Sequence, residues 1–268
     1  MKKEKIKLIR QLVKELNKHN YLYYTLGRPI LQDKEYDKLY DKLVALENEL
    51  GTVYTDSPTQ KVGNEILKEM KKVQHLIPLK SLEKTKDIEV VKSFIKDKEC
   101  VLMLKCDGLT NKLEFSNNKL IRASSRGNGE VGEDITSNVK RYKNIPLKIS
   151  EENITITGEA VIFKDDFIEI NKCLKEEDKF ANPRNLVSGS VRVLNPNVTR
   201  DRKVNFLGFG ILGNSKAKTK IEQLNLLEDL GFETAPYCLV NQINLEQKIK
   251  LIREEAEQKG IPYDGMVI

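Results

Sequence analysis

The chain has 268 residues, of which 32% are charged, 39% are hydrophobic and 6% are aromatic, with no Trp. This length accommodates one large domain, or a small domain followed by a medium one. No apolar run approaches the ~20 residues of a membrane-spanning helix, and the Lys-rich start lacks the apolar segment of a signal peptide. We therefore expect neither a membrane-spanning nor a secreted protein.

The charge balance and the cysteines narrow the class further. Lys and Arg total 46 against 40 Asp and Glu, which gives a net charge of +6. Such a surplus suits an anionic partner such as DNA or a nucleotide, and it suits equally a lysine-rich surface that only confers solubility. The four cysteines form no C-x-x-C pair, so we expect no zinc, no disulfide framework and a reducing cytoplasm: Cys100, Cys106, Cys173 and Cys238.

The first 70 residues read as a helical hairpin. Apolar residues recur at helical spacing over residues 4–19, and Gly27-Arg28-Pro29 then breaks the pattern. Asp33 is placed to cap a second helix, whose apolar stripe includes Tyr36 and continues to Leu50. Residues 51–63 read as a loop. We expect a small helical module over residues 1–70 and a second domain over residues 71–268.

The second domain reads as α+β with mainly antiparallel sheets and flanking helices. Its predicted strands are residues 100–104, 110–115, 119–125, 154–162 and 204–212, with a hairpin turn at Asn117-Asn118. Helices are predicted near 85–97, with Thr85 as a possible cap, and near 165–175, 219–230 and 245–259. Gly231 and Gly260 close the last two helices. The strict alternation of strand and helix that a parallel sheet needs is absent.

The most informative site for chemistry is the sequence Lys105-Cys106-Asp107-Gly108, which follows an apolar strand. A lysine amine attacks phosphorus only when it is neutral, so a nucleophilic lysine needs a partly desolvated pocket or cationic neighbours. Asp107 could orient the amine or a metal-bound water, and the glycine allows a tight exit from the strand. A surface turn that holds Lys and Asp is the alternative.

Further polar residues lie along the same domain. Arg126 stands in a glycine-rich turn and offers a phosphate or ribose contact, and Glu159 lies inside an apolar strand, where a carboxylate needs a partner. Arg184 and Arg192 lie among small residues, as in sites that bind polyanions. Each has a structural alternative. Arg126 could form a salt bridge at a hairpin end, Glu159 could make a buried structural hydrogen bond, and Arg184 and Arg192 could lie in a solvated loop.

The whole chain resembles the N-terminal part of NAD+-dependent bacterial DNA ligases. The resemblance rests on motifs in the family's order: Asn20-Tyr21-Leu22-Tyr23-Tyr24, Asp33-Lys34-Glu35-Tyr36-Asp37, Asp56-Ser57-Pro58-Thr59-Gln60-Lys61-Val62-Gly63, Lys105-Cys106-Asp107-Gly108, Arg126-Gly127-Asn128-Gly129, Gly132-Glu133-Asp134-Ile135-Thr136 and Phe180-Ala181-Asn182-Pro183-Arg184-Asn185. It implies a nucleotidyltransferase fold in residues 71–268. It also implies nicked double-stranded DNA as partner, and we expect a cytoplasmic monomer.

The resemblance also implies roles for residues. Lys105 would attack the α-phosphorus of NAD+ and form lysyl-AMP, with release of nicotinamide mononucleotide (NMN), assisted by Asp107 and Mg²⁺. The nicotinamide half would be held by Tyr23, Tyr24, Asp33, Tyr36 and Asp37, although Tyr36 also suits a helical core. Adenosine would contact Ser81, Leu82, Met103 and Arg126. Glu159 would bind ribose and metal, and Arg184 and Arg192 would face the NMN phosphate or DNA.

Several positions depart from the family's pattern. Met103 stands where the family carries a Glu that reads the adenine amino group, Asn128 replaces an Asp, and Ala160 replaces a Val. The closing segment from Ile261 to Ile268 is two residues short, and two phosphate-binding lysines of the family would lie beyond it. We therefore expect a truncated adenylation domain that does not seal nicks alone. A non-catalytic module that binds NAD+ or nicked DNA is the alternative, and an ATP-dependent ligase is a third.

Overall fold

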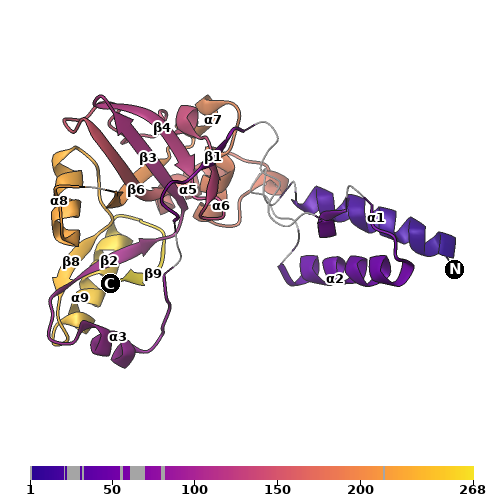
Figure 1. The fold of residues 1–268 in the computed structure, drawn as a ribbon, viewed down its shortest axis with the longest axis horizontal. Helices are drawn as coiled ribbons and strands as arrows, with labels where there is room; N and C mark the ends of the chain where they lie inside the picture. Colours follow the sequence, from indigo (N-terminus) through magenta and orange to yellow (C-terminus); the bar gives the residue numbers. More distant parts are fainter. Residues whose placement is uncertain are drawn as a thin grey trace.

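The computed structural model describes residues 2–20, 22, 31, 33–54, 57–60, 70–79, 82–213 and 215–268. Helices α1 (Lys2–Asn20) and α2 (Asp33–Leu50) lie side by side, at the N-terminal end of the chain in Figure 1. Their contact is apolar, as the spacing predicts, and is formed by Ile9, Leu12, Val13, Leu16 and Leu43. The short 3-10 helix η2 (Pro58–Gln60) packs against both, with Thr59 Oγ1 donating to Glu47 Oε2 at 2.5 Å.

The largest sheet has four antiparallel strands in the order β4-β3-β6-β7. They are β3 (Leu109–Ser116), β4 (Lys119–Ser125), β6 (Asn153–Val161) and β7 (Asn205–Leu212). Asn117 and Asn118 both have left-handed backbone conformations, with φ of 49° and 65°, as a two-residue hairpin turn requires. The predicted strands and hairpin of this sheet are thus confirmed, with ends that move by one residue.

Two smaller antiparallel sheets complete the strands. The order β8-β2-β9 joins β8 (Tyr237–Val240), β2 (Cys100–Cys106) and β9 (Tyr263–Val267). The strand β1 (Lys72–Gln74) pairs with β5 (Val131–Glu133). Strand β2 continues two residues beyond the predicted strand and so carries Lys105 within the sheet. The α+β class with antiparallel sheets is confirmed.

Four predicted helices are present: α3 (Ile88–Ile95), α5 (Lys164–Lys172), α8 (Lys220–Asp229) and α9 (Leu245–Gln258). The proposed cap of α3 was wrong, because Asp87 rather than Thr85 accepts the backbone N–H of Glu89. The side chain of Thr85 instead accepts the N–H of Asp87, two residues before the actual cap. Gly231 and Gly260 have φ of +86° and +64° and end α8 and α9 as expected.

The described residues after position 70 also form shorter helices: α4 (Thr136–Val139), α6 (Pro183–Val191), α7 (Pro196–Asp201) and the 3-10 helix η3 (Glu176–Asp178). Helix α6 packs against β3 and β6, whereas α9 packs against β2 and β8 (Figure 1). One apolar core joins these layers and includes Leu104, Leu113, Ile156, Leu186 and Ile252. It shares no residue with the core of the helical pair. Within the described ranges, no helix has both the length and the apolar character that crossing a membrane requires.

Candidate active site

Lys105 lies near the end of β2, where its amine meets a carboxylate from β9. Its Nζ donates to Oδ1 and Oδ2 of Asp264 at 2.5 and 2.6 Å. Lys105 is opposite Gly265 and Cys106 is opposite Tyr263, so Asp264 is the extra residue of a β-bulge. Bulges redirect side chains, and this one turns Asp264 toward Lys105. Both side chains remain about two-fifths exposed, at 39% and 43%, so the amine is open to a ligand.

Asp107 follows β2 directly and is held from two sides. Its backbone N–H donates to the carbonyl of Pro262 at 2.8 Å, and its Oδ1 accepts from Arg184 Nη1 at 2.6 Å. Arg184 belongs to the first turn of α6, a helix that Asn182 caps by accepting the N–H of Asn185. The predicted residues Asp107 and Arg184 are therefore brought together beside the strand that carries Lys105.

Gly108 allows two strands to approach closely at this point. A Cβ at this position would lie 1.9 Å from the carbonyl oxygen of Ala160, inside any allowed contact. The next residue of β6 toward its start is Glu159, which is opposite Thr110 and accepts its Oγ1–H at 2.9 Å. The glycine of the Lys105-Cys106-Asp107-Gly108 sequence thus fits a steric need, and its backbone N–H bonds the buried carboxylate of Glu159.

Glu159 is buried, and burial raises its pKa to about 7. The hydrogen bond from Thr110, the charge of Arg184 and the N–H of Gly108 act in the opposite direction. The carboxyl therefore changes its charge near neutral pH. Burial also raises the pKa of Cys106 to about 12, so its thiol stays protonated beside Lys105. Strongly shifted groups of this kind are typical of functional sites.

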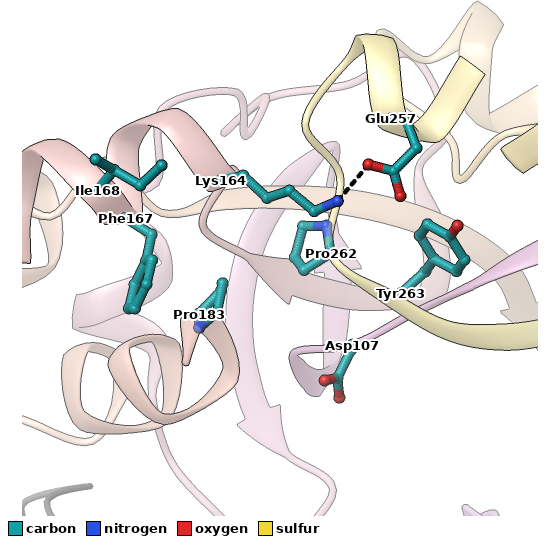
Figure 2. Close-up of a pocket in the computed structure, with 8 residues that line it drawn as sticks. All are labelled: Asp107, Lys164, Phe167, Ile168, Pro183, Glu257, Pro262 and Tyr263. Atoms are coloured by element: carbon teal, nitrogen blue, oxygen red, sulfur yellow. Dashed lines mark hydrogen bonds and ion pairs between the residues drawn. The ribbon is translucent and has the colours of Figure 1, made fainter. Parts of the chain in front are cut away.

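A pocket of about 590 Å³ opens beside Asp107 (Figure 2). Its walls are mainly apolar and aromatic, and they are formed by Asp107, Lys164, Phe167, Ile168, Pro183, Glu257, Pro262 and Tyr263. Lys164 Nζ donates to Glu257 Oε2 at 2.6 Å and lies 5.9 Å from the centroid of the Tyr263 ring. Among these lining residues, Asp107 is the one that the sequence analysis predicted as a site residue.

Arg126 and Arg192 each contact a neighbour within the second part of the chain. Arg126 Nε donates to the carbonyl of Leu79 at 3.0 Å. Arg192 Nε lies 2.9 Å from Glu133 Oε2, an ion-pair distance without the geometry of a hydrogen bond, and both side chains are largely buried. The roles predicted for the two arginines remain predictions.

Met103, Leu82 and Tyr36 are the further predicted residues that the structure describes. Met103 is buried in β2 between Tyr237 and Val267, and Leu82 is 62% exposed. The ring of Tyr36 stacks on Tyr40, with centroids 6.2 Å apart, and packs against the helical core, which is the structural alternative for this residue. Tyr23, Tyr24, Ser81 and the side chains of Asp33 and Asp37 lie outside the described residues.

Sequence reasoning missed Asp264 and Thr110. The sequence Tyr263-Asp264-Gly265 was visible as an Asp-Gly pair in the closing segment, yet its pairing with β2 depends on a contact 159 residues distant in sequence. Thr110 lies two residues after Gly108, at the start of the next predicted strand. Thr110 and Lys112 are polar residues on the same face of that strand, which was a weak signal of a polar site. Neither residue type is distinctive by itself.

Two family models cover nearly all of the chain. Residues 67–268 match the family described as the NAD-dependent DNA ligase adenylation domain, and residues 2–63 match the DNA ligase-like, N-terminal NAD+-binding domain. The chain belongs to the NAD-dependent DNA ligase adenylation-domain family. The resemblance inferred from the ordered motifs is confirmed, and Lys105 and Asp107 stand within the residues that match the adenylation domain of NAD-dependent DNA ligase.

Individual relatives agree with this family. The DNA ligase of Lachnoclostridium phytofermentans is 42% identical over an alignment of 265 positions, which covers 97% of this chain and 41% of the relative. The DNA ligase of Ruminiclostridium cellulolyticum is 38% identical over 274 residues, with 99% and 41% covered. The chain thus spans about two-fifths of the length of these DNA ligases.

Solved structures show a distant similarity. Mycobacterial DNA ligase D complexed with ATP and MES aligns with a TM-score of 0.35 at 15% identity, over 62% of this chain and 46% of that one. The ATP-dependent DNA ligase from bacteriophage T7 aligns with a TM-score of 0.35 at 13% identity, over 69% and 64%. These weak alignments add nothing to the argument about this adenylation-domain chain.

Proposed function

We propose that this chain transfers AMP from NAD+ to Lys105 and releases NMN, the first step of nick sealing. The observation that carries the proposal is the Lys105 amine, which is partly exposed at a strand end beside Asp264, in a chain of the adenylation-domain family. Asp107, Arg184 and Glu159 lie around the same strand end. These are the charges that a phosphoryl substrate and a lysine nucleophile need.

The transfer balances with groups that are present. Lys105 Nζ gives up one proton before the attack, and its electron pair then forms the bond to the α-phosphorus of NAD+. A second proton passes from the nitrogen to the departing NMN phosphate, which leaves the phosphoramidate nitrogen neutral. The bond from that phosphorus to the bridging oxygen breaks, and NMN leaves with the electron pair on its phosphate. Asp264 lies at hydrogen-bond distance from Nζ and is placed to accept the proton. Arg184 is placed to stabilise the negative charge that develops on phosphate oxygens.

We assign the two halves of NAD+ to the two units of the chain. Residues 1–70 would hold the nicotinamide half through Tyr23, Tyr24, Asp33, Tyr36 and Asp37, because aromatic rings stack on a pyridinium and carboxylates bind ribose hydroxyls. Residues 71–268 would hold adenosine through Ser81, Leu82, Met103, Arg126 and Glu159. The separate apolar cores of the two units support this division.

The donors at Lys105 suit Mg²⁺, which is bound in proteins by one or two carboxylates together with water and substrate phosphates. Glu159 and Asp264 provide such oxygens, and no larger group of acidic, His or Cys side chains gathers within the described ranges. Bound Mg²⁺ would supply positive charge at the phosphates. Glu159 must be ionised to take part, and its pKa of about 7 allows this at neutral pH.

We further propose that the longer relatives act on nicked double-stranded DNA in replication or repair, and that this chain acts as a cytoplasmic monomer. The net charge of +6 and the family's name support a DNA partner.

The test is intact-mass spectrometry after incubation with NAD+ and Mg²⁺. The expected result is a covalent AMP adduct, formed together with free NMN. Acid should then remove the AMP from the protein, because a phosphoramidate bond is acid-labile. Binding of NAD+ with no adduct would contradict the proposal and would support the alternative of a non-catalytic binding module. Lys105→Ala serves as the negative control.

A further inference from the structure

His75 joins two segments that the proposed function assigns to adenosine. It follows β1, and its backbone N–H donates to the carbonyl of Glu130 at 2.7 Å. Its side chain is 5% exposed, and Nε2 lies 3.1 Å from the carbonyl oxygen of Arg126. A carbonyl only accepts, so Nε2 carries the hydrogen and Nδ1 carries the lone pair. Within the described part of the chain, Nδ1 is buried and has no hydrogen-bond partner.

Two more hydrogen bonds fasten the same segment to the Arg126 turn. Leu79 N–H donates to the carbonyl of Gly129 at 2.9 Å, and Arg126 Nε donates to the carbonyl of Leu79 at 3.0 Å. A Cβ at Gly129 would come within 3.0 Å of that Leu79 oxygen, and a Cβ at Gly132 would come within 3.1 Å of His75 Nε2. The glycines of this turn therefore permit the close approach that His75 uses.

Apolar burial alone does not hold this segment. Val73 and Leu79 are buried, but Leu76 is 91% exposed and Ile77 is 44% exposed. Polar contacts from His75 and Arg126 therefore fix the middle of the segment, and the predicted adenosine contacts Ser81 and Leu82 follow it in sequence.

The contacts continue from the Arg126 turn to the buried carboxylate. Arg126 N–H donates to the carbonyl of Thr110 at 3.0 Å, and Thr110 Oγ1 donates to Glu159 Oε2 at 2.9 Å. The backbone of Arg126 is thus bonded to His75 on one side and to the residue that binds Glu159 on the other. A displacement of Arg126 would be transmitted to both.

We propose that His75 is a positioning residue for the adenosine half of NAD+. Its Nε2–H fixes the carbonyl of Arg126 and so sets Arg126 and the segment before Ser81 in the geometry that binds adenosine. The inference rests on the proposed function. Burial, together with the charge of Lys112, lowers the pKa of His75 below 6.5. Hydrogen bonds to the backbone of Arg126 and Ser125 and the charge of Glu114 raise the pKa, but they do not outweigh burial. The neutral ring at pH 7 agrees with a single donor at Nε2.

Two substitutions separate the role of the nitrogen from that of the ring. The amide nitrogen of Gln reaches the position of Nε2, whereas that of Asn reaches only the position of Nδ1. NAD+ affinity is measured by calorimetry in the 268-residue chain with Lys105→Ala, so that no adduct forms. We expect His75→Gln to remain within about threefold of the parent, and His75→Asn to bind NAD+ about tenfold more weakly, as for one lost hydrogen bond.

Three further measurements make the test specific. The affinity for NMN alone should be the same in all variants, because the proposed function assigns the nicotinamide half to residues 1–70. Leu76→Gln changes an exposed residue of the same segment and should leave NAD+ affinity unchanged. Thermal unfolding midpoints of His75→Gln and His75→Asn are compared to identify a general loss of structure.

Equal weakening by Gln and Asn, an unchanged affinity in His75→Asn, or an equal loss of NMN binding would each overturn the role of His75. The binding measurement needs no chemistry. If the parent chain with Lys105 intact binds NAD+ and forms no adduct, the proposed transfer fails, whereas the ratio of affinities between the two variants still decides the role of His75.

Discussion

Lys105 Nζ donates to both carboxylate oxygens of Asp264, although the two residues are far apart in sequence. The pairing of β2 with β9 and the bulge at Asp264 create this contact. Before Nζ can attack phosphorus, one proton must pass from the amine, and Asp264 lies where that proton can go. The same ion pair therefore holds the Lys105 amine in place and provides the group that can remove its proton.

Asp264→Asn should lower the rate of self-adenylation by about a hundredfold, as expected for loss of a proton acceptor. Because the pair is partly exposed, the free energy of unfolding should fall by no more than about 1 kcal/mol. Single-turnover release of NMN measures the rate. Glu255→Gln breaks the comparably exposed pair with Lys259, which does not line the pocket, and serves as the matched control. An equal loss of rate in both variants would contradict a specific role for Asp264.

Glu159 should make stability depend on pH. Burial raises its pKa from 4.5 to about 7, so the folded chain binds more protons than the unfolded chain between these values. The contribution of this group to stability is therefore greatest below pH 4.5 and falls as the pH rises to about 7. Glu159→Gln removes this dependence, so the variant should gain stability relative to the parent between pH 5 and pH 8. Denaturant unfolding of both proteins at each pH measures the difference in their free energies of unfolding. A variant that loses stability relative to the parent as the pH rises would contradict the raised pKa of Glu159.

Gly108→Ala should destabilise the chain by about 1–3 kcal/mol, as overpacking of a close contact does. The added Cβ would meet the carbonyl of Ala160 at 1.9 Å, so β3 and β6 must separate next to Glu159. Self-adenylation should fall with the displaced carboxylate. Gly265→Ala is the control for folding, because a Cβ there meets nothing closer than 4.0 Å. Comparable unfolding midpoints for the two variants would show that the close approach is unimportant.

Met103→Glu tests the residue that departs from the family's pattern. Met103 is buried, so the new carboxylate should destabilise the free chain by about 1–3 kcal/mol. A carboxylate that accepts the adenine amino group should also increase the preference for NAD+ over its hypoxanthine analogue, about tenfold for one hydrogen bond. Adduct yields with the two dinucleotides give the preference. An unchanged ratio would place the base away from Met103.

NAD+ should bind, and ATP should not substitute for it. Aromatic and carboxylate residues of the first 70 positions suit the nicotinamide riboside and repel a triphosphate. Calorimetric titration with each nucleotide measures this, with Tyr23→Ala as the variant that should weaken NAD+ binding. Equal or tighter binding of ATP would contradict the role assigned to the helical unit.

Local patterns predicted the elements with strong periodicity, and they failed where contacts distant in sequence decide the structure. The hairpin at Asn117-Asn118 and the ends of α8 and α9 at Gly231 and Gly260 follow from residue type alone. The short strands β1, β5, β8 and β9 are stabilised by pairing with partners elsewhere, which no local pattern records. Helices α6 and α7 begin at Pro183 and Pro196 after capping Asn residues, a signal that was present although no helix was predicted there.

The candidate site shows the same division. The sequence identified Lys105, Asp107, Glu159 and Arg184 as candidate site residues. In the structure Asp107 accepts a hydrogen bond from Arg184, and Glu159 lies on β6 opposite Thr110 of β3. The sequence could not identify Asp264, because the partner of Lys105 is set by the order β8-β2-β9 and by a bulge of one residue. It also gave no indication that Arg192 would be paired with buried Glu133.

The most direct test is to locate the AMP group within the chain by tandem mass spectrometry after reaction with NAD+ and Mg²⁺. The adduct is predicted on Lys105, and it should be absent from both Lys105→Ala and Lys105→Arg, because arginine keeps its proton. An AMP group on another lysine, such as Lys112 or Lys164, or an adduct that persists in either variant, would contradict the assignment of Lys105 as the nucleophile.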